Sequence, residues 1–490
     1  MEPRFHFSKP PWMTLLWWLD RWRVAVFVVL GVVYACGMNG RWRITSDSAW
    51  YVMLARDGGG PGEAMRSAVG VGATPPGLSW LIAATGGEAG WGTALVMLAI
   101  AAGVLVITYR MFVEHADRPT AVLMTTVLGL SGLFMEMTYG LLTELPFMLG
   151  LVLLLWGHER RMNRRGPLGL ALGMMLLGVA WMAMFRSVVA VVIGAYVLAE
   201  VIHVIGRRDQ RRPGLALIGL AGASAVVLWS VSTAIRDDVV IFFNVLTIKP
   251  PEAWMLSVRM LATEALPEAI FGQDVPPSLA WPASALIVLA GLLLVRTRLL
   301  WGVLFGVFVL QWVVFLSDPR YVLPILPLAF FGLWRCGVGV LSKWPEPWRG
   351  IGFGLGVLAM FGANVVAVVN VVGEQRSGDF YADYRSSKFA GLVALAEVIR
   401  EQTPHDAVLV VVPNIGLELA VLSGRVWIVG EAPPEAALFL VGPPSVAFEQ
   451  SWLSPKWDAV SEPLGSVVDE RSGETWELRR VEPRREAGYD

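Results

Sequence analysis

Long apolar runs, separated by polar loops, follow one another over most of the chain. A helix needs about 20 apolar residues to cross the hydrocarbon core of a bilayer, and apolar runs approaching this length recur between Val24 and Val372. The pattern therefore predicts a multi-pass α-helical membrane protein with about eleven transmembrane helices. The predicted spans are Val24–Gly37, Gly92–Phe112, Thr120–Met135, Leu141–Trp156, Leu168–Met184, Val188–Ile205, Gly214–Thr233, Ala283–Val295, Leu299–Leu316, Tyr321–Leu333 and Ile351–Val372.

Arginine and lysine are unevenly distributed between the two sets of alternating loops, and the richer set includes the first residues of the chain. Basic residues are enriched in cytoplasmic loops, so this set is predicted to be cytoplasmic. An odd number of spans then places the C-terminal segment outside. The predicted parts are a cytoplasmic or interfacial segment 1–23, a transmembrane module 24–373 with outer loops 38–91 and 236–282, and an extracytoplasmic domain 374–490.

The composition of this last segment differs from that of the rest of the chain. KFAGLVALAEVIREQ (Lys388–Gln402) has the spacing of an amphipathic helix, and AVLVVV (Ala407–Val412), RVWIVG (Arg425–Gly430) and ALFLVG (Ala437–Gly442) have the apolar character of buried strands. Helix and strand patterns that alternate in this way predict a small α/β domain.

The overall composition supports the membrane prediction. The 490 residues are 55% hydrophobic and 16% charged, whereas soluble domains carry about 25% charged residues. Two cysteines, Cys36 and Cys336, and five scattered histidines suggest neither a disulfide framework nor a metal cluster. The net charge of −1 gives no sign of nucleic-acid binding. The sequence requires no cofactor, and a divalent metal lacks support from it.

Ionisable residues near the ends of spans are candidates for function, because a charge is costly in lipid. On the predicted topology, Asp47, Glu144, Arg186 and Arg320 all fall at the outer face, which makes the group more informative than any member alone. Lys249 is a further cation on that face.

Each candidate has a structural and a functional interpretation. Either Asp47 or Ser46 caps the short helix that begins near them, or Asp47 acts as a general base, with Tyr51 on the same helix face. Glu144 either complements a helix N-terminus or contacts a sugar or an acceptor. Arg186, Arg320 and Lys249 either anchor span ends at the head groups or bind phosphate, for which arginine offers a planar fork of donors.

Four motifs, in this order along the chain, carry a resemblance to a known family: SDSAWYVMLAR (Ser46–Arg56), TPPGLSWLIA (Thr74–Ala83), TELPFMLGLVLLLW (Thr143–Trp156) and RYVLPILPLAFF (Arg320–Phe331). Together they resemble the GT-C glycosyltransferases, which include the protein O-mannosyltransferases and bacterial aminoarabinose transferase. These multi-pass enzymes take a sugar from a polyprenyl-phosphate carrier at the outer or lumenal face of a membrane.

The resemblance implies roles for residues that match its motifs. Asp47 is expected to be the catalytic base, beside Tyr51 in the same motif; Glu144 is expected to line the sugar or acceptor site. Arg320 and Tyr321 are expected to hold the carrier phosphate. Many relatives have an Asp-Glu pair in the first outer loop where this chain has Asp47 and Ser48, so no metal is assigned.

The resemblance further implies an inverting enzyme of the inner or plasma membrane, with a polyprenyl-phosphate-linked sugar as donor. The acceptor, whether lipid, glycan or protein, stays open. Three alternatives also stay open: a transporter or flippase of lipid-linked glycans, an O-antigen ligase type of enzyme, and a non-enzymatic scaffold. A transporter is expected to have its site near mid-membrane, and ligases usually carry a histidine in a large outer loop, which 236–282 lacks.

Overall fold

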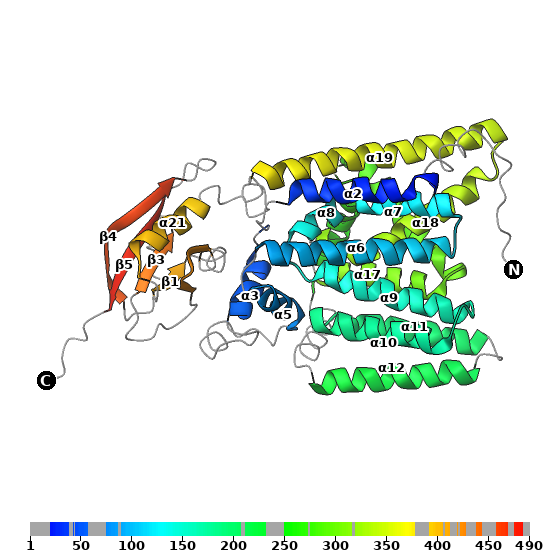
Figure 1. Ribbon diagram of the computed structural model, residues 1–490, viewed down its shortest axis with the longest axis horizontal. Helices are drawn as coiled ribbons and strands as arrows, with labels where there is room; N and C mark the ends of the chain where they lie inside the picture. Colours follow the sequence, from blue (N-terminus) through cyan, green and yellow to red (C-terminus); the bar gives the residue numbers. More distant parts are fainter. Residues whose placement is uncertain are drawn as a thin grey trace. The chain divides into compact units, whose positions relative to one another are not determined.

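Figure 1 shows the computed structural model of the chain, in which helices predominate up to residue 377. It describes residues 20–38, 43, 45–56, 75–86, 90–206, 211–231, 249–272, 275–315, 319–377, 392–404, 407–411, 419, 422–427, 438–442, 457–468 and 475–483. Its contacts divide the chain into two units. The first unit comprises Met1–Met38, Gly72–Gly77 and Leu95–Gly373, and the second comprises Asn39–Val71, Leu78–Ala94 and Glu374–Asp490.

The first unit is helical, and each of the predicted apolar runs coincides with a helix or a pair of helices. The helices wholly or mainly in it are α2 (Arg23–Gly37), α6 (Trp91–Val113), α7 (Arg118–Gly129), α8 (Gly132–Tyr139), α9 (Glu144–Met162), α10 (Leu168–Phe185), α11 (Val189–Gly206), α12 (Arg211–Val231), α14 (Pro251–Met260), α15 (Leu266–Phe271), α16 (Pro277–Leu293), α17 (Leu299–Phe315), α18 (Leu326–Leu341) and α19 (Glu346–Ser377). Shorter turns are the π-helical η2 (Leu261–Ala265) and the 3-10 turns η3 (Leu294–Arg296) and η4 (Pro319–Ile325).

Several of these helices have the length and character of membrane spans. Within the described residues, 5 segments are long and apolar enough to cross a bilayer, or 6 if the bent pair α7–α8 is one span. The five are Trp91–Val113, Leu168–Phe185, Pro277–Arg296, Pro319–Leu341 and Trp348–Arg376. Others, such as α2 and α17, are apolar but shorter. The apolar helices support an integral membrane protein, and the count of eleven spans stays a prediction.

The predicted span Thr120–Met135 is broken rather than continuous. Helices α7 and α8 meet there at a bend of 57°. The Tyr34 hydroxyl of α2 donates to the Gly129 carbonyl at 2.7 Å, and Tyr139 donates to the Tyr34 carbonyl at 2.9 Å. The Tyr34 hydroxyl thus satisfies the backbone carbonyl at the end of α7, as a helix interrupted within a bilayer requires, and Tyr139 ties α8 to α2.

The second half of the predicted outer loop 236–282 is largely helical. Helix α14, turn η2 and helix α15 run without interruption over 251–271, while 232–248 lies outside the described residues. The prolines that suggested a loop stand at helix starts, Pro251 in the first turn of α14 and Pro267 in that of α15. Proline is tolerated at Pro251, since the first backbone N–H groups of a helix have no partner inside it, whereas Pro267 lies within the continuous segment and directly follows the first residue after the π-helical turn η2.

The core of the first unit is aromatic. The rings of Phe112 and Phe331 stack at 5.8 Å, and Trp301 meets Phe331 edge-on at 4.9 Å. All three side chains are almost completely buried. By contrast, Val28 and Val32 of α2 are more than half exposed. Apolar side chains on outward faces are the arrangement that a lipid environment favours.

The second unit contains α3 (Ser46–Arg56), most of α5 (Gly77–Ala84), α21 (Leu392–Gln402) and a 5-stranded sheet in the order β2-β1-β3-β5-β4. The strands are β1 (Val408–Val411), β2 (Val426–Trp427), β3 (Leu438–Gly442), β4 (Trp457–Val468) and β5 (Thr475–Pro483). Strands β2, β1 and β3 are parallel, and β5 pairs antiparallel with both β3 and β4. Helix α21 packs on β4 and β5.

The predicted helix of the tail and its three predicted strands correspond to α21, β1, β2 and β3. The hairpin β4–β5 was not predicted. Strand β4 contains Pro463 and Gly465, and its pairing with β5 shifts register at both residues. Proline and glycine interrupt the alternating pattern by which a strand is recognised in a sequence.

Candidate functional site

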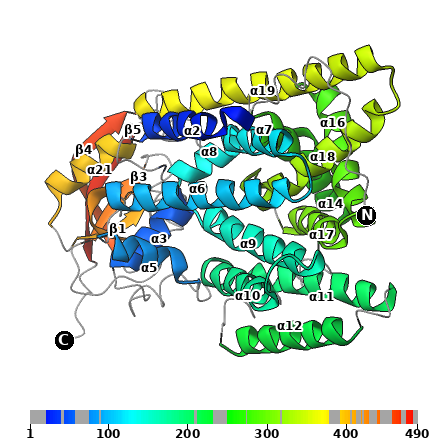
Figure 2. The ribbon, with the colours of Figure 1, turned by 45° about the vertical axis from the view of Figure 1, so that its right-hand side comes forward.

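The antiparallel packing of α9 and α10 positions the first members of the candidate site. The two helices lie side by side in Figures 1 and 2. A Cβ atom on Gly178 would lie 2.6 Å from the Gly150 carbonyl oxygen, so only glycine permits this approach. Trp181 of α10 also donates to the Pro146 carbonyl at 2.9 Å. The end of α10 therefore lies beside the start of α9.

Arg186 follows the last residue of α10, and Glu144 is the first residue of α9. The backbone of Arg186 is extended (φ −149°, ψ 137°), and its Nη1 lies 2.5 Å from Glu144 Oε1. Two residues that are 42 positions apart in the sequence thus form an ion pair at one end of the helix pair.

Turn η4 adds Arg320 and Tyr321 to this pair. Arg320 Nε lies 3.5 Å from Glu144 Oε1, and Arg320 Nη2 donates to the Tyr321 hydroxyl at 3.1 Å. The guanidinium carbons of Arg186 and Arg320 lie 4.8 and 5.0 Å from the centroid of the Tyr321 ring. Both distances are within cation–π range. The structure therefore brings together four of the predicted site residues, here called the arginine cluster: Glu144, Arg186, Arg320 and Tyr321.

Burial differs between the members of the arginine cluster. The Glu144 side chain is 3% exposed, whereas those of Arg186 and Arg320 are 20% and 12% exposed. Glu144 Oε2 is buried and makes no hydrogen bond within the described part of the chain. Two guanidinium groups and one carboxylate leave one net positive charge. Chemically, the cluster can bind an oxyanion, because guanidinium groups offer paired N–H donors.

Lys249 has different partners. Its ammonium group donates to Ser257 Oγ at 2.6 Å and to the carbonyls of Val313 and Val314 at 2.8 and 3.1 Å. It also lies 5.2 Å from the centroid of the Trp254 ring. Burial lowers the pKa of Lys249. Since an ammonium group has three N–H donors, these contacts account for all of them at the C-terminal end of α17.

Asp47 and Tyr51 lie on α3, in the second unit. The suggestion that Asp47 caps this helix is wrong. Ser48 N–H donates to Thr45 Oγ1 at 3.1 Å, and Thr45 N–H donates to Ser48 Oγ at 2.6 Å, which is a reciprocal cap. The Asp47 side chain is exposed and Tyr51 is buried. Ser48, which stands where many GT-C relatives have glutamate, thus has a role in the cap.

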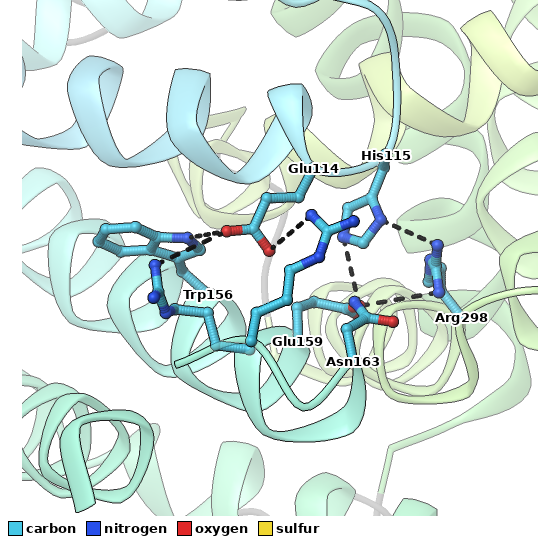
Figure 3. A network of polar contacts seen from close by, with 8 residues as sticks. Glu114, His115, Trp156, Glu159, Asn163 and Arg298 are labelled. Atoms are coloured by element: carbon cyan, nitrogen blue, oxygen red, sulfur yellow. Dashed lines mark hydrogen bonds and ion pairs between the residues drawn. The ribbon is translucent and has the colours of Figure 1, made fainter. Parts of the chain in front are cut away.

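A larger polar network, shown in Figure 3, was not predicted from the sequence. It lies at the other end of α9, where Glu159 Oε2 is 3.2 Å from His115 Nε2 and 3.7 Å from Arg298 Nη1. Asn163 donates to the same oxygen at 3.4 Å. Next to it, Glu114 accepts a hydrogen bond from the indole N–H of Trp156 and forms ion pairs with Arg160 and Arg165 at 3.9 and 3.7 Å. All these residues together are here called the Glu159 network.

The sequence contained a signal for this network, namely the arginines used to predict the cytoplasmic loops. The sequence did not reveal which acids and bases form ion pairs with one another, because these pairs depend on how α6, α9 and α17 pack. Among the described residues, no group of three or more His, Cys, Asp or Glu side chains is placed to hold a metal ion.

Comparisons with known proteins agree with the fold. No protein-family model matches the sequence, and a search of curated proteins finds no match. Among solved structures, ArnT from Cupriavidus metallidurans in the apo state matches with a TM-score of 0.58 and 14% identity, over 93% of this chain and 97% of that one. ArnT bound to undecaprenyl phosphate matches with a TM-score of 0.54 and 15% identity, over 94% and 98% of the two chains.

The apo oligosaccharyltransferase of Archaeoglobus fulgidus is also similar. It matches with a TM-score of 0.51 and 12% identity, over 86% of this chain and 66% of its own. Both neighbours are GT-C membrane transferases, and the match to ArnT extends over nearly the whole of both chains. The chain therefore has the GT-C fold, as its sequence motifs predict.

Proposed function

We propose that the chain is an inverting glycosyltransferase that moves a sugar from a polyprenyl-phosphate carrier to an acceptor hydroxyl or amine at the outer membrane face. The observation that carries the proposal is the arginine cluster, in which Arg186 and Arg320 converge on Tyr321 and leave one net positive charge. ArnT, whose fold this chain shares, has been solved bound to undecaprenyl phosphate.

In this mechanism the carrier phosphate is the leaving group. Arg186 and Arg320 bind its oxygens and stabilise the negative charge that grows as the bond from the anomeric carbon to the phosphate oxygen breaks. Tyr321 fixes the two guanidinium groups, and Glu144 lines the sugar or acceptor side. The sequence predicts Lys249 as a further phosphate ligand, but we propose that it stabilises the C-terminal end of α17 instead, because its ammonium group already has three acceptors.

Asp47 acts as the general base. Its carboxylate takes the proton of the acceptor as the acceptor oxygen or nitrogen forms the new bond to the anomeric carbon. Attack from the side opposite the phosphate inverts this carbon. The exposure of Asp47 and the cap formed by Thr45 and Ser48 support this role, because the helix does not depend on the Asp47 carboxylate for its cap.

The proposed topology places the N-terminus in the cytoplasm and the C-terminal α/β domain outside, in the inner or plasma membrane. Its support is the clustering of basic residues from two separate parts of the chain, Arg160 and Arg165 at the end of α9 and Arg298 before α17, at one end of α9. Glu144 and Arg186 lie at the other end of the same helix. A reporter fused after Asp490 that is active only in the cytoplasm would contradict this topology.

A transfer assay tests the function. Membranes containing the wild-type protein or Asp47→Asn are given a panel of radiolabelled polyprenyl-phosphate sugars. We expect one carrier to lose its sugar with the wild type, and at least about a hundredfold slower loss with Asp47→Asn, since the amide keeps the shape but cannot accept the proton. Equal rates would remove Asp47 as the base. Movement of an intact carrier across the membrane, with no transfer, would favour a transporter.

A further inference from the structure

Glu144 occupies an unusual position for a residue that lines a sugar site. The same oxygen atom, Glu144 Oε1, lies 2.5 Å from Arg186 Nη1 and 3.5 Å from Arg320 Nε. The two guanidinium groups would repel each other over the shared Tyr321 ring if no anion lay between them. The carboxylate therefore holds two like charges together.

Glu144 also sets the charge of the arginine cluster. The two arginines alone carry two positive charges, and the buried carboxylate reduces this to one. We propose that Glu144 is a positioning residue that lowers the positive charge of the arginine cluster by one, and so favours the sugar-linked carrier, a phosphodiester, over the released carrier phosphate. This inference rests on the proposed function and assigns Glu144 a role that acts through the arginines.

The chemistry of the two lipids gives the charge difference. A sugar-linked carrier phosphate is a diester and bears one negative charge. After transfer, the carrier is a phosphate monoester, which has a second pKa near 6 and bears close to two negative charges above neutral pH. The negative charge of Glu144 therefore opposes the doubly charged product about twice as strongly as the singly charged substrate. Glu144 thus weakens product binding and speeds its release.

The contacts of Glu144 separate this role from a purely structural one. Glu159, the buried glutamate at the other end of α9, has His115, Arg298 and Asn163 around one oxygen. Glu144 Oε2 is buried and makes no hydrogen bond among the described residues. Glu144 thus differs from Glu159 in its partners, which are two guanidinium groups that share one oxygen and one aromatic ring.

The test measures two affinities of the full-length protein in nanodiscs at pH 8. The probes are undecaprenyl phosphate, a monoester, and undecaprenyl methyl phosphate, a diester that lacks a sugar. We expect Glu144→Gln to shift the ratio of the affinities towards the monoester by about tenfold or more relative to wild type. Glu144→Asp keeps the charge and is expected to keep the wild-type ratio. Arg186→Gln removes one positive charge and is expected to shift the ratio in the opposite direction.

Glu159→Gln is the matched control, because it removes a buried carboxylate from the same helix outside the proposed site, and its ratio is expected to equal that of wild type. If both probes bind but the ratio is the same in Glu144→Gln, Arg186→Gln and wild type, the inference is wrong and the proposed function stands. If neither probe binds wild type, both fail. Because Arg186→Gln changes the charge independently, failure of Glu144→Gln to fold still leaves the inference testable.

Discussion

The two ends of helix α9 each hold a buried glutamate, and the two differ in their partners. The side chains of Glu144 and Glu159 are 3% and 4% exposed. One oxygen of Glu159 has three polar neighbours, and the surrounding network joins α6, α9 and α17 (Figure 3). Glu144 faces two partly exposed arginines and keeps one oxygen without a hydrogen bond in the described residues.

Burial of an acid in a membrane helix therefore does not by itself mark a functional site. A buried carboxylate with all its partners in place holds helices together, as Glu159 does. At the Glu144 end, by contrast, two guanidinium groups share one carboxylate oxygen and lie beside the same Tyr321 ring, which is the arrangement proposed to bind phosphate. The two lie about 22 Å apart along the helix, at a rise of about 1.5 Å per residue, so variants at one end can serve as controls for the other.

The largest expected effect is on stability, at the Glu159 end. Glu159→Ala leaves His115 and Arg298 without their anion, and removal of one partner from a buried ion pair costs about 3–5 kcal/mol. We expect a loss near the lower end, about 3 kcal/mol, because Arg298 keeps some contact with solvent. Thermal unfolding in detergent measures it. If Glu159→Ala has wild-type stability, or if the folded variant binds the carrier more weakly than wild type, the proposed difference in role between Glu144 and Glu159 is wrong.

The next effect is on binding, at the Glu144 end. Arg320→Ala removes a charged donor from the proposed phosphate site, and hydrogen bonds to charged groups contribute about 1.5–3 kcal/mol. We therefore expect undecaprenyl phosphate affinity to fall roughly 10- to 100-fold. Arg320→Lys should recover only part of it, because an ammonium group lacks the planar fork. Wild-type affinity in Arg320→Ala would remove this residue from the phosphate site.

A smaller effect is expected at Lys249, whose ammonium group already has three acceptors. Lys249→Met should reduce the free energy of unfolding by about 1.5 kcal/mol, because Ser257 and the carbonyls of Val313 and Val314 lose their donor. Carrier affinity, measured alongside by titration, should stay at the wild-type value. Weaker carrier binding with unchanged stability would instead place Lys249 at the phosphate, as the sequence predicts.

The smallest effect is expected in the cap of α3. Thr45→Ala removes one half of the reciprocal cap and should cost about 1 kcal/mol, seen as faster hydrogen exchange of the backbone amides of 46–56. Transfer should slow far less than in Asp47→Asn, since Asp47 keeps its carboxylate. Equal losses of transfer in the two variants would mean that Asp47 acts through the helix rather than on the acceptor.

Much of the fold follows from local sequence patterns, while the site depends on packing. Apolar runs predict the helices one by one, and Asp47, Glu144, Arg186 and Arg320 are recognisable as costly charges near span ends. The ion pair between Glu144 and Arg186 depends on the close approach of Gly150 and Gly178, which no single run reveals. The cap by Thr45 was missed because Asp47 and Ser46, beside it, are equally good capping residue types.

The β4–β5 hairpin and the bend between α7 and α8 were missed for a related reason. Pro463 and Gly465 interrupt the strand pattern but are accommodated by register shifts. The Gly129 carbonyl beside the bend accepts a hydrogen bond from Tyr34 of α2, a helix that is distant in the sequence. In both cases distant partners stabilise a conformation that the local sequence disfavours.

The most direct test of the proposed carrier site is an experimental structure of the full-length protein in nanodiscs with undecaprenyl phosphate. We expect phosphate density within hydrogen-bonding distance of the guanidinium groups of both Arg186 and Arg320, beside the Tyr321 ring. Phosphate density elsewhere, with neither guanidinium group in contact with it, would contradict the proposed carrier site.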